Sequence, residues 1–181
     1  TIDDAAGEAF DKAAKMLGFP YPGGPLIDKH AKNGDCKKFE FAKPRVPEYN
    51  FSFSGLKTSI LYFLQKQEKI NPNFIKENRD DLCASIQYTI VEILMKQLKN
   101  VANKYGIKDI AIAGGVSANS SLRKRLIDEG EKCGWQVYIP RFEYCTDNAA
   151  MIAMTGKIMF DQNLFTDQKV TAMARIPFSN S

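Results

Sequence analysis

The sequence predicts a helix-rich α/β fold, and two observations point to it. In residues 107–161 an apolar run, Ile110 to Ala113, ends at two glycines and is followed by a helical pattern, a second strand-like run and another helical pattern. Such alternation of strands and helices is typical of half of an open α/β sheet. Over residues 79–105 apolar side chains recur every three or four positions, which predicts one long amphipathic helix.

The elements before the long helix follow from caps, spacing and breakers. Asp3 or Asp4 is expected to cap a first helix, which ends at GFPYPGGP because alternating Pro and Gly cannot continue it. A short helix over 25–31 comes next, and FEF at 39–41 is predicted as an edge strand. The stretch FSFSGLKT alternates and then turns helical, with Ser54 as the expected N-cap.

The second half of the chain carries the predicted sheet. Strands are expected at 110–113 and 136–139, with a helix over about 119–133 between them. A last helix follows the stretch CTDN, where Thr146 or Asp147 is the expected cap. Two strands are few for an independent sheet, and the chain starts without Met on a helix-like segment, so we expect a fragment of a longer protein.

Composition excludes several classes of function. No stretch approaches the roughly 20 apolar residues that span a bilayer, so we expect no membrane-spanning segment. The formal charge of +4 is compatible with a polyanionic partner without predicting one. The four cysteines form no C-x-x-C pair, which argues against a zinc ribbon and for reduced thiols in the cytoplasm. His30 is the only histidine, so a site that needs two imidazoles cannot be complete in this chain.

Two glycine-rich turns could approach a ligand. AGGVSAN places Gly114 and Gly115 between a strand and a helix, where backbone N–H groups and the helix N-terminus could meet a phosphate. The same turn could be an ordinary connection in which Asn119 caps the helix. YPGGP, which contains Gly24, could form a similar wall, although on pattern alone a helix-ending turn is the commoner explanation.

Three acids stand near such turns. Asp11 lies beside the apolar Phe10, and Asp28 follows the glycine pair of YPGGP. Each of these carboxylates alone is more often solvated than in contact with a ligand. Asp147 precedes a run of small and apolar residues, so it could cap a helix, bind a metal, or do both. A metal needs further donors that no nearby histidine supplies, and local reasoning therefore favours the cap.

Four stretches in register resemble one known family. DDAAGEAFDKAAKMLGFPYPGGP, FSFSGLKT, IAGGVSANSSLR and CTDNAAMIA occur in the order seen in the tRNA threonylcarbamoyltransferase family. This is the TsaD group, formerly described as O-sialoglycoprotein endopeptidases or glycoproteases. The resemblance covers nearly the whole chain, from Ile2 to about Phe160, and is least distinctive in residues 33–50 and in the tail.

The resemblance implies a fold and a reaction. Family members have the two-lobed actin-like, Hsp70-like ATPase (ASKHA) fold, so residues 1–181 would be a C-terminal lobe fragment, helix-rich with a small mixed sheet. We expect a helical insertion over about 25–106, an α/β segment over about 107–161 and a tail over 162–181. The family moves the threonylcarbamoyl group from threonylcarbamoyl-AMP to the exocyclic amine of the adenosine beside the anticodon. This is an acyltransferase activity that we expect the fragment alone to lack.

The resemblance also implies roles for particular residues, position by position. Asp11 and Gly24 match positions that contact the ribose of the adenylate, and Asp28 lies where many members have another such contact. Asn119 matches the amide that faces the nucleotide, with the pair Gly114–Gly115 as its backbone wall.

Asp147 matches a carboxylate ligand to one divalent metal ion, iron or zinc. In the family the other protein ligands are two histidines of an upstream H-x-x-x-H helix, which this sequence does not contain, and His30 matches neither. The expected metal site is therefore incomplete here. No general base is assigned.

The expected partners are threonylcarbamoyl-adenylate, tRNA and the TsaB-like and TsaE-like subunits of the threonylcarbamoylation complex, all in the cytoplasm. The run Arg123 to Arg125 is a candidate tRNA contact, although a solvated helix face explains such runs more often. A lobe without its first strands would expose a sheet edge, so we also expect a homodimer of the fragment.

Three other functions fit the sequence less well. A non-catalytic partner subunit of the same complex need not retain Asp11, Gly24, Asn119 and Asp147 together. A kinase of the same fold superfamily would share the glycine-rich wall but not the pair FSFSGLKT and CTDNAA. The residues form no protease constellation.

Overall fold

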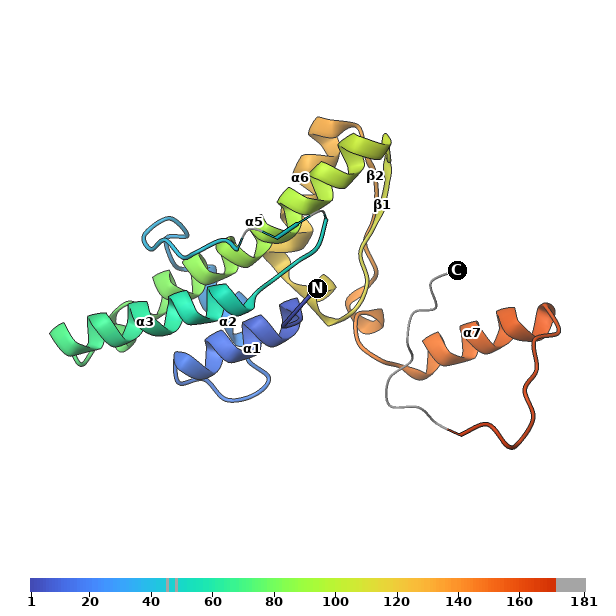
Figure 1. Cartoon of the computed structure of the whole chain (residues 1–181), viewed down its shortest axis with the longest axis horizontal. Helices are drawn as coiled ribbons and strands as arrows, with labels where there is room; N and C mark the ends of the chain where they lie inside the picture. Colours follow the sequence, from blue (N-terminus) through green and yellow to red (C-terminus); the bar gives the residue numbers. More distant parts are fainter. Residues whose placement is uncertain (45, 48, 172–181) are drawn as a thin grey trace. The chain divides into compact units, whose positions relative to one another are not determined.

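The computed structural model of the chain describes residues 1–44, 46, 47 and 49–171. The chain forms two units, Thr1–Thr146 and Asp147–Ser181, and each is described by itself. The elements of both units are drawn in Figure 1. In chain order they are α1 (Ala6–Met16), α2 (Gly24–Ala31), α3 (Ser54–Ile70), α4 (Phe74–Glu77), α5 (Arg79–Tyr105), β1 (Asp109–Ala111), the 3₁₀ helix η1 (Gly115–Ala118), α6 (Ser120–Cys133), β2 (Gln136–Tyr138), the 3₁₀ helix η2 (Phe142–Tyr144) and α7 (Ala149–Asp161).

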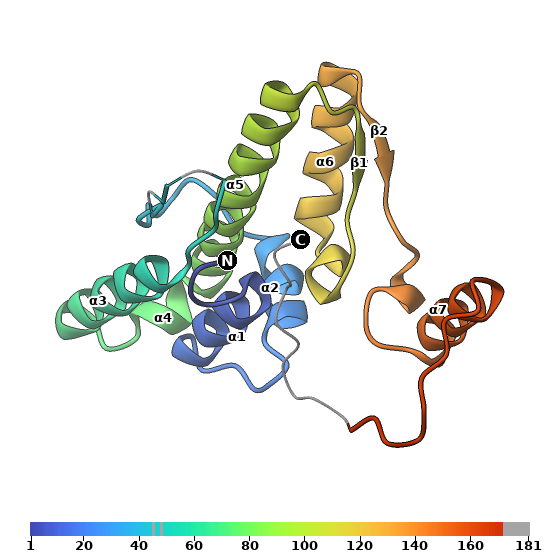
Figure 2. The same cartoon turned by 45° about the vertical axis from the view of Figure 1, so that its right-hand side comes forward.

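The long helix α5 is the spine of the first unit. At 27 residues it is about 40 Å long, enough to belong to two separate cores. Its first half packs with α1, α2 and α3, where Leu82, Ile86 and Ile90 are fully buried. Its second half packs with β1, α6 and β2 through Val91 and Met95. Figure 2 shows α5 running from the helices at its lower end to the strands at its upper end.

The predicted sheet is present, and among the described residues it has two strands. β1 and β2 run parallel, with Ile110 paired to Val137, and α6 forms the crossover between them. Each strand is shorter than its apolar run because pairing covers only three residues. This arrangement confirms the helix-rich α/β class. The predicted domain bounds at 25–106, 107–161 and 162–181 stay predictions, and residues 172–181 of the tail lie outside the described residues.

The edge strand predicted at 39–41 is wrong. The rings of Phe39 and Phe41 both pack on Phe63, with centroid distances of 5.3 and 5.5 Å. The backbone N–H groups of this segment donate to side chains instead of to a strand: Phe39 to Ser85 Oγ at 3.2 Å, and Ala42 to Ser59 Oγ at 3.1 Å. Alternating aromatic residues here fill an aromatic cluster, and the helices satisfy the backbone.

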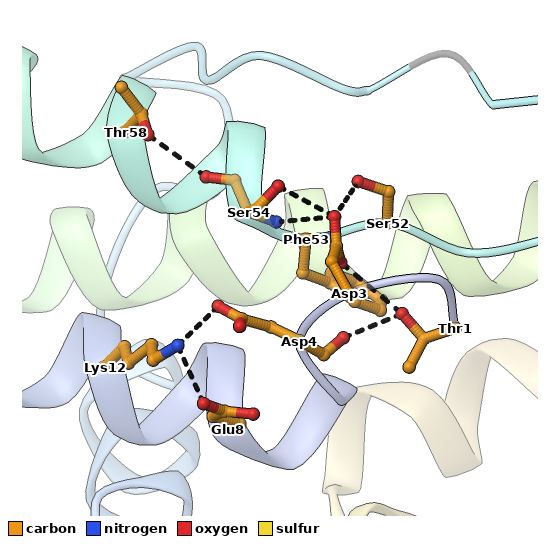
Figure 3. A network of polar contacts seen from close by, with 9 residues as sticks. All are labelled: Thr1, Asp3, Asp4, Glu8, Lys12, Ser52, Phe53, Ser54 and Thr58. Atoms are coloured by element: carbon orange, nitrogen blue, oxygen red, sulfur yellow. Dashed lines mark hydrogen bonds and ion pairs between the residues drawn. The ribbon is translucent and has the colours of Figure 1, made fainter.

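The predicted caps of the first two long helices are also wrong. α1 begins after Ala5, which makes no side-chain cap. Asp3 instead accepts hydrogen bonds at the start of α3: from Ser52 Oγ, from Phe53 N at 2.8 Å and from Ser54 Oγ at 2.7 Å. Figure 3 shows the carboxylate pointing at these groups. Ser54 is therefore the first helical residue, and its capping acceptor comes from a distant part of the chain.

The second unit contains α7, whose cap differs from the prediction. Asn148 is the N-cap, and its Oδ1 accepts from Met151 N at 3.0 Å. Thr146 and Asp147 therefore do not cap this helix. Within the unit the apolar side chains of α7 are exposed, with Ile152 at 76% and Phe160 at 64%. In the described part of the chain, no helix is both long and apolar enough to cross a bilayer.

Candidate functional site

Asp11 joins α1 to the start of α2. Its Oδ1 accepts from Gly23 N at 2.8 Å and from Gly24 N at 3.2 Å, so a side chain of α1 caps α2. A Cβ on Gly23 would lie 2.2 Å from the Cβ of Ala14, which means that the two helices can approach this closely only at a glycine. Among the described residues, the second oxygen of Asp11 receives none of the hydrogen bonds found. It remains available to a ligand.

Asp28 lies one turn beyond Gly24 on α2 and joins this helix to α6. Its carboxylate accepts from Ser120 Oγ at 2.7 Å and from Ser120 N at 3.3 Å. A negative charge at a helix N-terminus is favourable, because the unpaired N–H groups there carry partial positive charge. A phosphate at the first N–H of α6 would therefore meet the carboxylate of Asp28.

Asn119 is the N-cap of α6, one of the two roles that the sequence allowed. Its Oδ1 accepts from Leu122 N at 2.9 Å, and its Nδ2 donates to Gln87 Oε1 at 2.7 Å. The amide is buried, at 8% exposed, and so is Gln87, at 6%. One Nδ2 hydrogen is left over after these contacts, since an amide carries two.

The pair Gly114–Gly115 forms the turn from β1 to η1. Gly114 has φ of +79°, a conformation that favours glycine, and its carbonyl accepts from Ser117 N at 2.9 Å. Both glycines are exposed, and a Cβ built on either would meet no atom within 4 Å. The backbone of this turn is therefore accessible to a ligand. Ser117 Oγ, by contrast, is buried and without a partner among the described residues.

These contacts place four of the predicted residues, Asp11, Gly24, Asp28 and Asn119, in one continuous row. Asp11 contacts Gly24 by a hydrogen bond, Asp28 follows on the same face of α2, and Asp28 contacts the residue next to Asn119. α1 also packs on η1, where the Cβ position of Gly7 lies 3.6 Å from Val116 Cγ2. The row therefore crosses α1, α2 and the start of α6. Two hollows among the described residues lie elsewhere, between α6 and the segment 135–142.

Comparison with known proteins identifies the family. The family model described as tRNA N6-adenosine threonylcarbamoyltransferase (TsaD) matches residues 1–154. The chain belongs to this family. A protein of that name from Christiangramia forsetii is 56% identical over 178 residues, which are 98% of this chain and 52% of the relative. One from Riemerella anatipestifer is 56% identical over 175 residues, 97% of this chain and 51% of the relative.

A more distant relative of the same name gives the same picture. The Thermotoga neapolitana protein is 48% identical over 158 residues, which are 86% of this chain and 46% of the relative. The chain thus spans about half the length of the curated relatives that it matches. The family predicted from the four motifs is confirmed.

Asp147, the residue that the family resemblance assigns to a metal, belongs to the second unit. It is exposed, and the cap beside it is Asn148. In the described residues no group of three or more His, Cys, Asp or Glu side chains could hold a metal ion. His30 is the only histidine, and its Nδ1 lies 2.6 Å from Asp80 Oδ1. These residues alone do not fit a complete iron or zinc site, and the role of Asp147 as one ligand stays a prediction.

The structure adds residues that sequence reasoning missed. Gly23, rather than Gly24, is the glycine that close packing requires, and Gln87 and Ser120 hold the row together. One signal was available: Gln87 is a polar residue on the apolar face of a long helix. Its partner, in a different element 32 residues away, could not be read from spacing.

The basic run at 123–125 is not a fully solvated helix face, and its candidate role as a tRNA contact stays a prediction. Arg125 pairs with Glu92 and with Glu129. A hydrogen bond from Lys99 lowers the pKa of Glu129 despite the opposing effect of burial, so this carboxylate is ionised between its cationic neighbours. Arg123 is half-buried and bonded to backbone carbonyls. Only Lys124 of the three is exposed.

Proposed function

We propose that this chain supplies the adenosine-binding part of a tRNA N6-adenosine threonylcarbamoyltransferase. The reaction moves the threonylcarbamoyl group from threonylcarbamoyl-AMP to the exocyclic amine of the adenosine beside the anticodon. Family membership supports the reaction class. One structural observation carries the placement of the substrate: Asp11, Gly24, Asp28 and the Asn119 cap lie in a single row across three elements.

Each group in the row has chemistry that suits one part of an adenylate. The free oxygen of Asp11 and the lone pairs of Asp28 that Ser120 leaves unused can accept hydrogen bonds from ribose hydroxyls. The open backbone of Gly114–Gly115 can approach the phosphate, whereas the first N–H of α6 already donates to the carboxylate of Asp28. The remaining hydrogen of Asn119 Nδ2 can donate to the nucleotide between them.

In this reaction the main task of the protein is to orient the two reactants. Threonylcarbamoyl-AMP is a mixed anhydride and is already activated. The amine nitrogen bonds to the carbonyl carbon and loses a proton, the bond from that carbon to the phosphate oxygen breaks, and AMP leaves. Holding the carbonyl against the incoming amine therefore supplies much of the rate. A row that binds the ribose through two carboxylates would fix the position of the adenylate, one of the two reactants that must be aligned.

We further propose Asp147 as one ligand of a divalent ion, iron or zinc, whose other ligands would come from outside these 181 residues. Partner subunits similar to TsaB and TsaE would bind the same protein, and a tRNA substrate places it in the cytoplasm. The 181-residue chain by itself should be inactive, because it presents the row without the rest of the site.

The test is a full-length protein in which this chain replaces the matching part of the Christiangramia forsetii relative. We expect it to modify tRNA from threonylcarbamoyl-AMP, as measured by mass spectrometry of tRNA nucleosides. Asp11→Asn keeps an oxygen for the glycine N–H groups but removes the charge. It should raise KM for threonylcarbamoyl-AMP about ten-fold or more, since a hydrogen bond to a charged group contributes roughly 1.5–3 kcal/mol.

Asp128→Asn, on the surface of α6, is the matched control and should leave KM unchanged. The proposal is overturned if Asp11→Asn behaves like this control, or if the 181-residue chain alone modifies tRNA. In a parallel reaction with ATP as the donor, phosphorylated nucleosides or sugars would indicate a kinase of the same fold superfamily.

A further inference from the structure

Arg123 joins separate backbone segments around the start of α6. Its Nε donates to the carbonyl of Ser117 at 2.6 Å, and its Nη2 donates to the carbonyl of Pro140 at 2.7 Å and to Cys145 Sγ at 3.1 Å. The guanidinium carbon also lies 4.0 Å from the ring centroid of Phe142. One side chain thus ties together η1, the segment after β2 and the residue after η2.

Arginine is the side chain that fits this position. Its planar fork offers several donors at fixed angles and stacks on an aromatic ring, whereas a lysine ammonium is a point charge at the end of a flexible stem. The Nε hydrogen and both Nη2 hydrogens are used inside the protein. A guanidinium with these bonds is committed to structure and is poorly placed to bind a tRNA phosphate through the same atoms.

Arg123 ties together two segments that adjoin, in the sequence, residues of the proposed function. Ser117 lies in η1, between the open glycine turn and the Asn119 cap, and is 1% exposed. Cys145 is 2% exposed and stands two residues before Asp147 in the sequence. Arg123 therefore fixes the turn assigned to the nucleotide against the segment from which Asp147 continues.

We propose that Arg123 is a positioning residue of the transferase site, an inference that rests on the proposed function. It holds the nucleotide turn and the approach to Asp147 in one register. Loss of the guanidinium would leave the ribose contacts of Asp11 and Asp28 in place but would misalign the carbonyl and the amine. The expected signature is a lower kcat with little change in KM.

The first test uses the full-length chimera described above. Arg123→Lys and Arg123→Gln should lower kcat about ten-fold or more, because misplaced reactants lose the benefit of orientation, while KM for threonylcarbamoyl-AMP changes less than about three-fold. Asp128→Asn, the control on the same helix, should match the parent. The concentration of active sites is measured by titration with a tightly binding adenylate analogue, and each rate is divided by that concentration. Partial unfolding alone therefore does not lower kcat. Added methylguanidinium should restore part of the activity of Arg123→Ala.

The second test measures whether Arg123 shields Cys145 and does not depend on enzyme activity. In the 181-residue chain, maleimide labelling of Cys145, located by peptide mass spectrometry, should be slow in the parent and in Lys124→Ala and fast in Arg123→Gln. If the parent chimera lacks activity, the proposed function fails while the labelling still decides whether Arg123 covers Cys145. Unchanged labelling, or fast labelling with unchanged kcat per site, overturns the positioning role.

Discussion

Asn119 is held by two contacts, and each fixes a different property of its side chain. The hydrogen bond from Leu122 N fixes where Oδ1 lies, and the hydrogen bond to Gln87 fixes where Nδ2 lies. Both residues of the amide pair are buried, so neither can exchange its partner for bulk water. The direction of the one remaining amide hydrogen is therefore determined by Gln87, a residue of a different helix.

Replacing Gln87 tests this arrangement. Gln87→Leu would leave a buried Nδ2 of Asn119 without its acceptor, and we expect the free energy of unfolding to fall by about 1–3 kcal/mol. Urea denaturation of the 181-residue chain measures it. Gln65→Leu, on the exposed face of α3, should change stability by less than about 0.5 kcal/mol. The double variant Gln87→Leu/Asn119→Ala should be less destabilised than the sum of the single variants, and strict additivity would contradict the contact.

The candidate site divides into what local sequence predicts and what it cannot. The cap at Asn119 could be predicted, because an amide before an amphipathic run is a local signal. The contact between Asp28 and Ser120 joins residues 92 positions apart, and no spacing rule reaches that far. Even the local signal fails when neighbouring polar residues compete: at the start of α7 the sequence favoured Thr146 or Asp147, and Asn148 takes the position.

At the scale of elements, helix α3 begins with a capping group that comes from elsewhere in the chain. Phe53, its N-cap, has no capping side chain, and Asp3 supplies the acceptor from 50 residues away. Ile2 N donates to Phe51 O at 2.9 Å, which keeps this first segment beside the helix start. The start of the chain therefore stabilises α3 rather than α1. The ends of α5 could be predicted from spacing, but this exchange of caps could not.

Because Asp3 caps α3, the free energy of unfolding should depend on the ionisation of this carboxyl and therefore on pH. Burial opposes ionisation of Asp3, but hydrogen bonds from Ser52, Phe53 and Ser54 outweigh it and hold the pKa of this carboxyl well below its ordinary value. A lowered pKa stabilises the folded state above the unfolded-state pKa of about 4, and this contribution is lost as the pH falls below that value. Asp3→Ala should cost about 1 kcal/mol at pH 7, the usual contribution of a cap.

Urea denaturation at a series of pH values checks this expectation. The difference in unfolding free energy between the parent and Asp3→Ala should shrink as the pH falls below about 4, because the parent then loses the same contribution. Asp128→Ala, a half-exposed carboxylate of α6, is the matched control and should show no such convergence. A difference that stays constant down to pH 3, or that is absent at pH 7, would contradict a capping role for Asp3.

For the whole molecule, the question is which apolar surfaces this chain leaves uncovered. Within its own unit α7 exposes Met151, Ile152, Met154, Ile158 and Phe160, between 45% and 76% each. A helix that is apolar around its circumference is normally buried. The described sheet has two strands, and a short parallel sheet normally has both faces and edges protected. The chain spans about half of its relatives, so in a longer protein further sequence could cover these surfaces.

We therefore predict that the 181-residue chain associates with itself. Sedimentation equilibrium should give an average mass above the 20.3 kDa of the monomer, increasing with concentration. Ile152→Asp places a charge on the apolar surface of α7 and should shift the mass toward the monomer, whereas Thr155→Asp adds the same charge at a polar position and should shift it less. If Ile152→Asp leaves the mass unchanged, α7 is not the contact and the sheet edge becomes the surface to test. A parent chain that stays monomeric at every concentration would contradict the prediction, because the exposed apolar area would then carry no measurable attraction.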